Sequence, residues 1–431
     1  MSQQAGLSFE QAPPFALPLR FFLTAPLFLL AAAILIVLAP DALASRWTPQ
    51  ALALTHALTL GFLAMVMLGA LMQMLPVVAG ATMPFSRAVG WITHALLALG
   101  SAALMAGFLT GDALLYQVGM ALLASAFLVF LLAASSSLVR AVASDTVTGM
   151  RLAMLCLAIT AALGLALALS RSTGWVLAET AAAIAAHAVL GLLGWVLLLV
   201  VSVAYQVVPM FQITPPYPPR LARWFAPVLF ALLVILALAP LLPQAAASAV
   251  ALVAQVGLAA GILAFALVTL RLQSRRRRKL PDVSLDFWRL GMASLIASVA
   301  AWMLARLSPA WADSDAYPLL LGVLFIGGFA VSVVSGMLYK IVPFLAWFHL
   351  QAQLQARAGS IPNMKEMIAQ RWMRWHFRLH LLACALLGCA TISPGLFAMP
   401  GGIATGLSAM LLWLNLVTTT RRYVSHGGRF A

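Results

Sequence analysis

The chain has 431 residues, of which 64% are hydrophobic and only 8% are charged. A soluble domain carries roughly 25% charged residues. This composition and the mean hydropathy of +1.04 therefore exclude a water-soluble enzyme, a disordered regulator and a secreted disulfide scaffold. The formal net charge is +15, from 25 Lys and Arg against 10 Asp and Glu. These basic residues stand between apolar runs with no aromatic-basic face. We therefore expect the chain to contact the lipid bilayer and not to bind nucleic acid.

Apolar runs of spanning length predict an all-α polytopic membrane protein with about 12 transmembrane helices. Roughly 20 apolar residues at 1.5 Å per residue are enough to cross ~30 Å of hydrocarbon. The whole chain, 1–431, is expected to form a single integral membrane domain. The expected spans are 18–40, 51–78, 89–110, 114–136, 151–170, 178–208, 224–243, 246–270, 287–306, 317–345, 376–396 and 400–419.

The distribution of basic residues predicts the orientation. An even number of spans places both termini on one side of the membrane. If that side is the cytoplasm, only Arg46, Arg171 and Arg306 fall in extracytoplasmic loops, and the other 22 of the 25 basic residues lie inside. The basic run 275–279 is then a cytoplasmic topology determinant that touches anionic headgroups. We expect the inner (plasma) membrane of the cell, with both termini cytoplasmic.

An internal repeat appears in three of the spans. They contain GFLAMVMLGALMQMLP (61–76), GWVLLLVVSVAYQVVP (194–209) and GFAVSVVSGMLYKIVP (328–343). Each has Gly fifteen residues before Pro and a small residue seven before it, and small residues allow helices to approach closely. The prolines are 133 and 134 residues apart, and each is expected to close its helix at the cytoplasmic end. This period predicts three four-helix repeats at roughly 18–136, 151–270 and 287–419.

The same motif carries polar side chains near its end. A polar residue stands three before each proline, and two motifs have Tyr four before it: Gln73, Gln206, Lys340, Tyr205 and Tyr339. We expect these residues to form a polar lining on three equivalent helices around a pseudo-threefold axis, because intramembrane polar groups often mark a pathway. The alternative is snorkelling and hydrogen bonding at the helix end.

Twelve spans in three units of four, with key helices 2, 6 and 10, resemble the catalytic subunit of the haem-copper oxidase superfamily. The strings THALTLGFLAMVMLGALMQMLPV, HAVLGLLGWVLLLVVSVAYQVVPM and MLYKIVPFLAWFHL look like a distant branch near cbb-type oxidase subunit I and NnrS-type membrane proteins. The resemblance implies a pseudo-threefold arrangement of the helices. It also implies a haem-ligating His near the outer end of span 2, where His56 stands, and a copper-ligating His on span 6, where His187 stands.

The sequence departs from the family at most of the other ligands. The family carries His ligands on spans 7 and 10, but 224–243 and 317–345 contain no His, and Gly191 stands where the redox Tyr of span 6 is expected. An active terminal oxidase is therefore not expected. The first hypothesis is a divergent relative that binds haem or copper for electron transfer, sensing or metal handling, with a respiratory or cytochrome partner. The alternative is a permease or binding protein that kept the fold and has no cofactor.

The candidate cofactor-binding and metal-ligating residues are His56 and His187, with a hydrogen bond to a neighbouring helix or a substrate contact as the alternatives. They stand five and seven residues before their repeated Gly, so their side chains point about 200° apart. His376 and His380, within WMRWHFRLH, are expected in an amphipathic segment at the cytoplasmic interface. The three cysteines lack metal or disulfide spacing and are expected to pack in the core. They are Cys156, Cys384 and Cys389.

Overall fold

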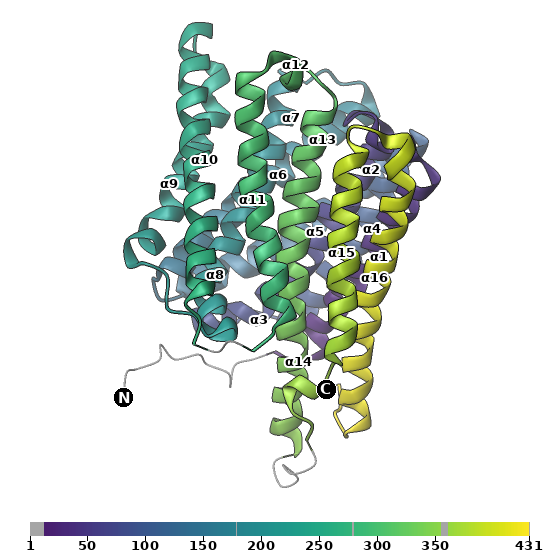
Figure 1. Ribbon diagram of the computed structural model, residues 1–431, viewed down its shortest axis with the longest axis vertical. Helices are drawn as coiled ribbons and strands as arrows, with labels where there is room; N and C mark the ends of the chain where they lie inside the picture. The colour runs from purple at the N-terminus through teal and green to yellow at the C-terminus, as the bar shows by residue number, and fades with distance from the viewer. Residues whose placement is uncertain (1–12, 178, 278–279, 355–360, 431) are drawn as a thin grey trace. The chain divides into compact units, whose positions relative to one another are not determined.

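The structure, a computed structural model, describes residues 13–177, 179–277, 280–354 and 361–430 (Figure 1). Arg278 and Lys279 of the predicted basic determinant lie outside these residues. The described residues form helices and no strands, which confirms the all-α fold class. Eleven of the described helices are long and apolar enough to cross a membrane.

The helices follow one another with short connections. In chain order they are α1 (Ala16–Leu38), η2 (Pro40–Leu43), α2 (Pro49–His56), η3 (Ala57–Ala64), α3 (Met65–Ala79), α4 (Ser86–Thr110), α5 (Ala113–Arg140), α6 (Asp145–Thr173), α7 (Thr180–Val189), η4 (Leu190–Leu197), α8 (Leu198–Gln212), α9 (Pro219–Leu238), η5 (Ala239–Leu241), α10 (Gln244–Ser274), α11 (Val283–Leu307), α12 (Pro309–Ala312), α13 (Ala316–Gly322), η6 (Val323–Val331), α14 (Ser332–Leu354), η8 (Met364–Glu366), α15 (Gln370–Ala390) and α16 (Pro394–Ser425).

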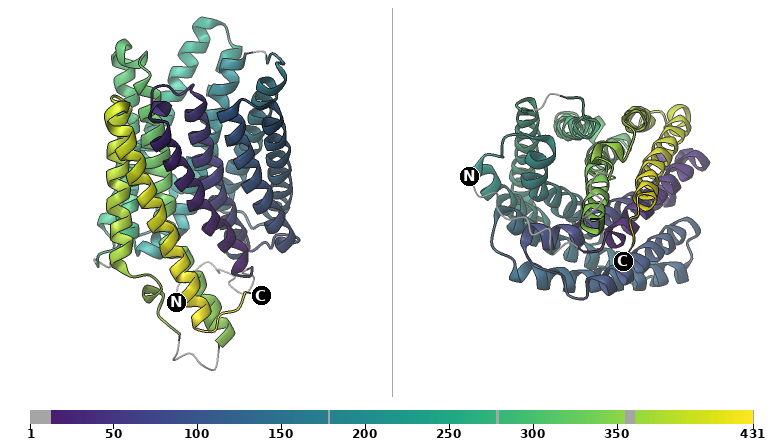
Figure 2. Two further views of the ribbon diagram at one scale, coloured as in Figure 1. Left: turned by 90° about the vertical axis from the view of Figure 1, so that its right-hand side faces the viewer. Right: turned by 90° about the horizontal axis from the view of Figure 1, so that it is seen from below.

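Helix α15 takes the place of the eleventh expected span, 376–396, and is not among the eleven apolar helices. Its first half carries Arg371, Arg374 and Arg378, which lower its hydropathy. It nevertheless runs beside α16 (Figures 1 and 2). The turn between the two helices comes earlier in the chain than expected, because α15 ends at Ala390.

The chain divides into two compact units. Unit 1 comprises the described residues of 74–96 and 111–280, and unit 2 those of 12–73, 97–110 and 281–431. In unit 1, α6 packs against α5 and α8, and α9 pairs with α10. In unit 2, α1 lies along α16, and α11 lies along η6 and α14 (Figure 2). Each unit therefore holds its own set of packed membrane helices.

The three helices that carry the sequence motif all contain a π-helical segment. These segments are η3 (Ala57–Ala64), η4 (Leu190–Leu197) and η6 (Val323–Val331). Their first residues are separated by 133 positions in both intervals (190 − 57 and 323 − 190). A π turn is rare, and where it occurs it usually interrupts an α-helix once. Its recurrence with the period of the sequence motif indicates that the three helices share a local design.

Small residues of the motif bring each of these helices against the helix that precedes it in its predicted repeat. A Cβ atom on Gly194 would lie 2.7 Å from Cys156 Sγ of α6, and one on Gly328 would lie 2.5 Å from Ser294 Oγ of α11. Both distances are too short for any larger side chain. The same relation places Gly61 against Phe28, Gly69 against Phe21, Gly336 against Phe287 and Ser202 against Gly149.

The expectation that the repeated prolines end their helices is wrong. Pro76, Pro209 and Pro343 lie inside α3, α8 and α14, which continue to Ala79, Gln212 and Leu354. Proline removes only one backbone donor, and neighbouring groups in a helical membrane protein can satisfy the carbonyl that it leaves open. The sequence rule for soluble helices therefore placed these boundaries too early.

Candidate functional site

His56, the predicted haem ligand, belongs to unit 2 and ends α2 directly before the π segment η3. The helix begins at Pro49, and the Thr48 side chain caps it by accepting a hydrogen bond from the Ala51 amide. His56 Nδ1 lies 2.8 Å from the Leu52 carbonyl oxygen, one turn earlier. This contact assigns the proton to Nδ1, which donates to the backbone. The ring also packs against Phe108, with 4.9 Å between ring centroids.

His187, the predicted copper ligand, belongs to unit 1 and packs on α6. Its Nδ1 lies 3.0 Å from the Thr160 carbonyl oxygen. Gly164 makes room for the ring, since a Cβ atom there would lie 2.9 Å from His187 Cε1. The side chain thus makes an interhelical hydrogen bond with a donating Nδ1. Metal ligation by either histidine stays a prediction.

The two histidines are not equivalent in their helices. His56 directly precedes η3, whereas His187 lies three residues before η4. The structure also places them in different units. Two α-helical residues separate their positions relative to the π segment, which corresponds to a rotation of about 200°.

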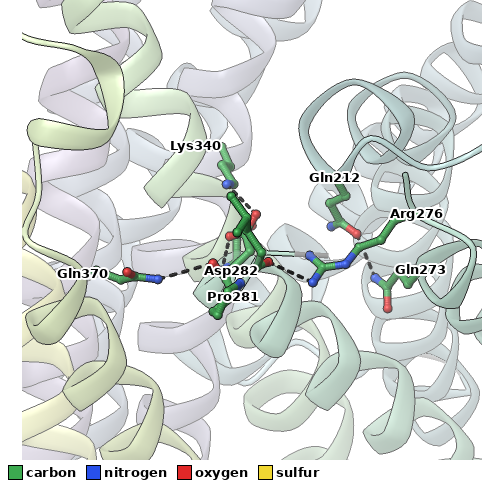
Figure 3. A network of polar contacts seen from close by, with 9 residues as sticks. Gln212, Gln273, Arg276, Pro281, Asp282, Lys340 and Gln370 are labelled. Carbon is green, nitrogen blue, oxygen red and sulfur yellow. Dashed lines mark hydrogen bonds and ion pairs between the residues drawn. The ribbon is translucent and has the colours of Figure 1, made fainter. Parts of the chain in front are cut away.

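The predicted polar residues of unit 1 have contrasting surroundings. The buried Tyr205 hydroxyl has no hydrogen-bond partner among the described residues, and its ring stands edge-on to Tyr217, with 5.3 Å between centroids. Tyr217 lies between α8 and α9, outside the apolar helices. Its side chain is nevertheless buried, and burial raises the pKa of its phenol. Gln206 is half-buried. At the end of the same helix, Gln212 accepts a hydrogen bond of 3.0 Å from Gln273 (Figure 3).

Lys340, the charged member of the predicted lining, is paired within unit 2. Its Nζ lies 2.7 Å from Asp282 Oδ2 (Figure 3), and both side chains are about one-fifth exposed. Asp282 also caps α11 through a hydrogen bond from the Ser284 amide to Oδ1. Close by, the Gln370 side chain donates to the Pro281 carbonyl. Lys340 therefore has a counterion that is itself fixed by the start of a helix. Gln73, also in unit 2, has a buried Oε1 without a partner in the described chain.

The fifth predicted residue, Tyr339, lies in a buried hydrogen-bonded cluster of unit 2. Its hydroxyl oxygen is 2.8 Å from His376 Nδ1 and accepts a 2.8 Å hydrogen bond from Asn415 Nδ2. One turn further along α15, His380 Nε2 lies 2.8 Å from Ser332 Oγ and 3.6 Å from Cys384 Sγ. These contacts join helices α14, α15 and α16 through polar side chains.

The expectation that the His376 and His380 side chains make interfacial contacts is wrong, because both are buried inside the protein. Their exposed fractions are 0% and 5%. The basic residues of α15 suggested an interfacial helix, but they lie on other faces of the helix than the two histidines. A signal was available in the i,i+4 spacing, which places both rings on one face. Ser332 and Tyr339, seven residues apart on α14, present matching partners to that face.

A cavity of about 150 Å³ lies in unit 2 beside this cluster. Its walls come from α1, α2, η3, α13, η6, α15 and α16 and are mostly apolar. The polar side chains among them are Arg46, Thr55, His380, Cys384, Thr405 and Ser408. Ser408 is 1% exposed, and its hydroxyl has no partner among the described residues. Thr55 lines the cavity and the adjacent His56 does not, so the cavity histidine is His380.

The cofactors implied by the resemblance do not fit the residues present. A haem exceeds most drug-sized ligands, whose pockets span roughly 300–1,000 Å³, whereas this cavity has about 150 Å³. The cavity histidine, His380, already has its Nε2 bonded to Ser332. In the described residues no group of three or more His, Cys, Asp or Glu converges on one point. A copper centre held by three side chains is therefore not built here.

Comparison with known proteins gives the fold. No family model matches the chain, and no curated protein matches it. Among solved structures, it is similar to a chain of a haem-copper terminal oxidase dimer determined by cryo-electron microscopy. The TM-score is 0.67 at 11% sequence identity, over 96% of this chain and 84% of the other. This likeness shows that the chain has a haem-copper-oxidase-like fold of membrane helices.

Proposed function

We propose that this protein uses an oxidase-like membrane fold to bind a small, uncharged and largely apolar molecule. The observation that carries the proposal is the cavity of unit 2, with its apolar walls and a few polar groups at His380, Thr405 and Ser408. The activity that follows is capture or permeation of that molecule, and not reduction of oxygen at a binuclear centre.

The size and lining of the cavity define the ligand class. Apolar cavities of about 150 Å³ take up xenon or benzene. Binding pockets typically combine apolar walls with a few polar groups that orient the ligand. The unpartnered Ser408 hydroxyl supplies one such group. Arg46, from the segment between η2 and α2, supplies a cation at the wall. A ligand with one polar end and an apolar body is best suited to this arrangement.

Crystals of the purified protein pressurised with xenon test the proposal. We expect one anomalous scattering peak in the cavity. Gly322 lines the cavity, and a Cβ atom there meets nothing within 4 Å, so Gly322→Leu should fill the space and remove the peak. Gly388→Leu is the matched control, because a Cβ atom at Gly388 is equally unobstructed and the residue does not line the cavity. A peak that survives Gly322→Leu, or no peak in the native protein, would contradict the proposal.

The second candidate is a haem- or copper-binding protein that transfers electrons to a respiratory or cytochrome partner. Its support is that His56 stands where the resemblance implies a haem ligand, and that His380 lines the cavity. A reduced-minus-oxidised visible spectrum with metal analysis distinguishes the two. A stoichiometric haem signal that is lost in His56→Ala would favour this candidate, and a colourless protein would favour small-molecule binding.

Orientation belongs to the same proposal. We place the protein in the inner (plasma) membrane with both termini in the cytoplasm, on the support of the positive-inside distribution of its basic residues. If the chain is a permease, Gln73 and Lys340 of the predicted lining, which both lie in unit 2, face its pathway. Reporter fusions at the C-terminus should then be active only as cytoplasmic reporters, and a periplasmic signal would reverse the assignment.

A further inference from the structure

The face of α15 that points away from the cavity carries three arginines. Arg371, Arg374 and Arg378 are all exposed, and their spacing of three and four residues places them along one stripe of the helix. His376 and His380 each follow an arginine of the stripe by two residues, which corresponds to about 200° of helical rotation. The arginine stripe is therefore roughly opposite the buried histidines and separate from the cavity.

The stripe extends deep along a helix that lies beside a membrane span. Helix α15 ends at Ala390, so Arg374 and Arg378 stand about 24 and 18 Å from that end. The hydrocarbon core is ~30 Å thick. On α16, which returns along α15, the first basic residue is Arg421, about 40 Å from the helix start at Pro394. Arg378 therefore falls at the level of the hydrocarbon, where an unpaired charge is costly.

These arginines have no carboxylate partner in the described residues. Helix α15 contains no Asp or Glu, and the ion pair found in the described part of the chain joins Lys340 to Asp282. Aromatic rings take the place of a counterion. The Arg371 guanidinium lies 5.2 Å from the ring centroid of the adjacent Trp372, and the Arg378 guanidinium lies 5.1 Å from that of Trp375. Stacking uses the face of a guanidinium, so its N–H groups stay available to an anion.

We propose that the arginine stripe of α15 binds an anionic phospholipid from the leaflet at the Gln370 end of the helix. The phosphate accepts paired hydrogen bonds from Arg374 and Arg378, which is the geometry that arginine forms with phosphate groups. The acyl chains lie along the apolar second half of α15, where Leu381 and Leu382 are exposed on the same side of the helix. The outward face of α15 thus matches a molecule with an anionic head and an apolar body.

The charge of the stripe selects the class of lipid. A zwitterionic lipid presents its own cation beside the phosphate, and that cation would be repelled by three neighbouring arginines. A lipid with a net negative charge has no such group. In the orientation proposed above, the Gln370 end of α15 faces the cytoplasmic leaflet, which is the leaflet that carries anionic lipids. This inference goes beyond the proposed function, because it concerns a surface that the cavity does not reach.

Lipid retention tests the site. The detergent-purified full chain is mixed with phosphatidylglycerol or phosphatidylcholine, and the bound lipid is counted by native mass spectrometry. We expect at least one phosphatidylglycerol per chain, bound about tenfold more tightly than phosphatidylcholine. Arg378→Gln should weaken phosphatidylglycerol binding about tenfold, and Arg378→Lys should weaken it less, because lysine keeps the charge but loses the paired N–H groups. Arg421→Gln is the matched control, because this exposed arginine lies beyond the length of α15, and it should bind lipid as the native protein does.

Thermal unfolding in lipid nanodiscs separates lipid binding from folding. The native protein should unfold at a higher temperature in phosphatidylglycerol than in phosphatidylcholine. Arg378→Leu should lose this difference, yet unfold no earlier than the native protein in phosphatidylcholine, because leucine removes a costly charge. Equal binding of the two lipids, unchanged binding in Arg378→Gln, or an equal loss in Arg421→Gln would overturn the proposal. Displacement of the lipid by inorganic phosphate would also overturn it, because the stripe would then recognise a free anion and not a phospholipid.

Discussion

Tyr205 in unit 1 and Tyr339 in unit 2 occupy the same place in the repeated motif, four residues before its proline, yet their surroundings differ. The Tyr339 hydroxyl joins His376 and Asn415. The Tyr205 hydroxyl is buried and has no partner among the described residues. Small residues at the same positions of the motif pack the helices around both tyrosines. The comparison teaches that the motif determines how helices pack, whereas the polar chemistry depends on residues outside it.

The partners that distinguish the two regions come from α15 and α16. His376 and His380 lie on α15, and Asn415 and Ser408 lie on α16. None of them belongs to the repeated motif. These polar groups of unit 2 therefore come from outside the small-residue packing that the repeated motif gives to both units.

The largest expected effect concerns the packing that the two regions share. Gly194→Ala and Gly328→Ala should each destabilise the protein, because the added Cβ atom collides with Cys156 or Ser294. Overpacking of this kind costs about 1–3 kcal/mol. Thermal unfolding of the detergent-purified protein measures the loss.

Gly327→Ala is the control for these variants. It changes the residue next to Gly328, and its Cβ atom meets nothing within 4 Å. It should leave stability unchanged or raise it by up to about 1 kcal/mol, because Ala favours a helix over Gly. Equal stability of Gly327→Ala and Gly328→Ala would show that the shared packing plan does not depend on the repeated Gly.

The next effect tests the difference between the two tyrosines. Tyr339→Phe removes a shared partner and leaves His376 and Asn415 short of a hydrogen bond in a buried cluster. An unsatisfied buried polar group costs about 1–3 kcal/mol, although hydrogen bonds between membrane helices average about 0.6 kcal/mol. We expect a loss of about 1–2 kcal/mol in thermal unfolding. Tyr205→Phe should be neutral or slightly stabilising, and a similar loss in both variants would contradict the contrast.

The smallest effect concerns the ion pair of Lys340 and Asp282. Both side chains are partly exposed, and such pairs contribute about 0.2–1 kcal/mol. Lys340→Met and Asp282→Asn should each lower stability modestly, and the double variant should lose less than their sum. The same variants test transport, since a permease with Lys340 in its pathway should lose uptake in Lys340→Met. Additive effects in the double variant would show that the pair is not coupled.

The sequence was sufficient for the fold class but not for the site. Span length and the period of the repeated motif can be read directly from the sequence. They therefore predicted the membrane helices and the motif in which the π segments recur. The site depends on which faces of α14, α15 and α16 meet. His380 was assigned to the interface because its neighbours Arg374 and Arg378 are basic, and local sequence does not reveal that the opposite face of the helix is buried. The extent of α14 beyond Pro343 was missed because proline removes only one backbone donor, and neighbouring groups in a membrane protein can satisfy the carbonyl that it leaves open.

The π segment η6 puts the two ends of its helix out of phase. Residues on both sides of and within η6 line the cavity, among them Leu319, Gly322, Ile326, Gly327 and Val331. A π turn closes its hydrogen bonds between residues five apart, so it holds one residue more than an α turn. One residue corresponds to about 100° of rotation in an α-helix. The extra residue therefore rotates the residues before η6, which line the cavity, relative to Ser332 and Tyr339, which contact α15. Deleting a single residue there would act as a rotation, and it would turn the cavity wall away from the buried histidines without shortening any contact surface.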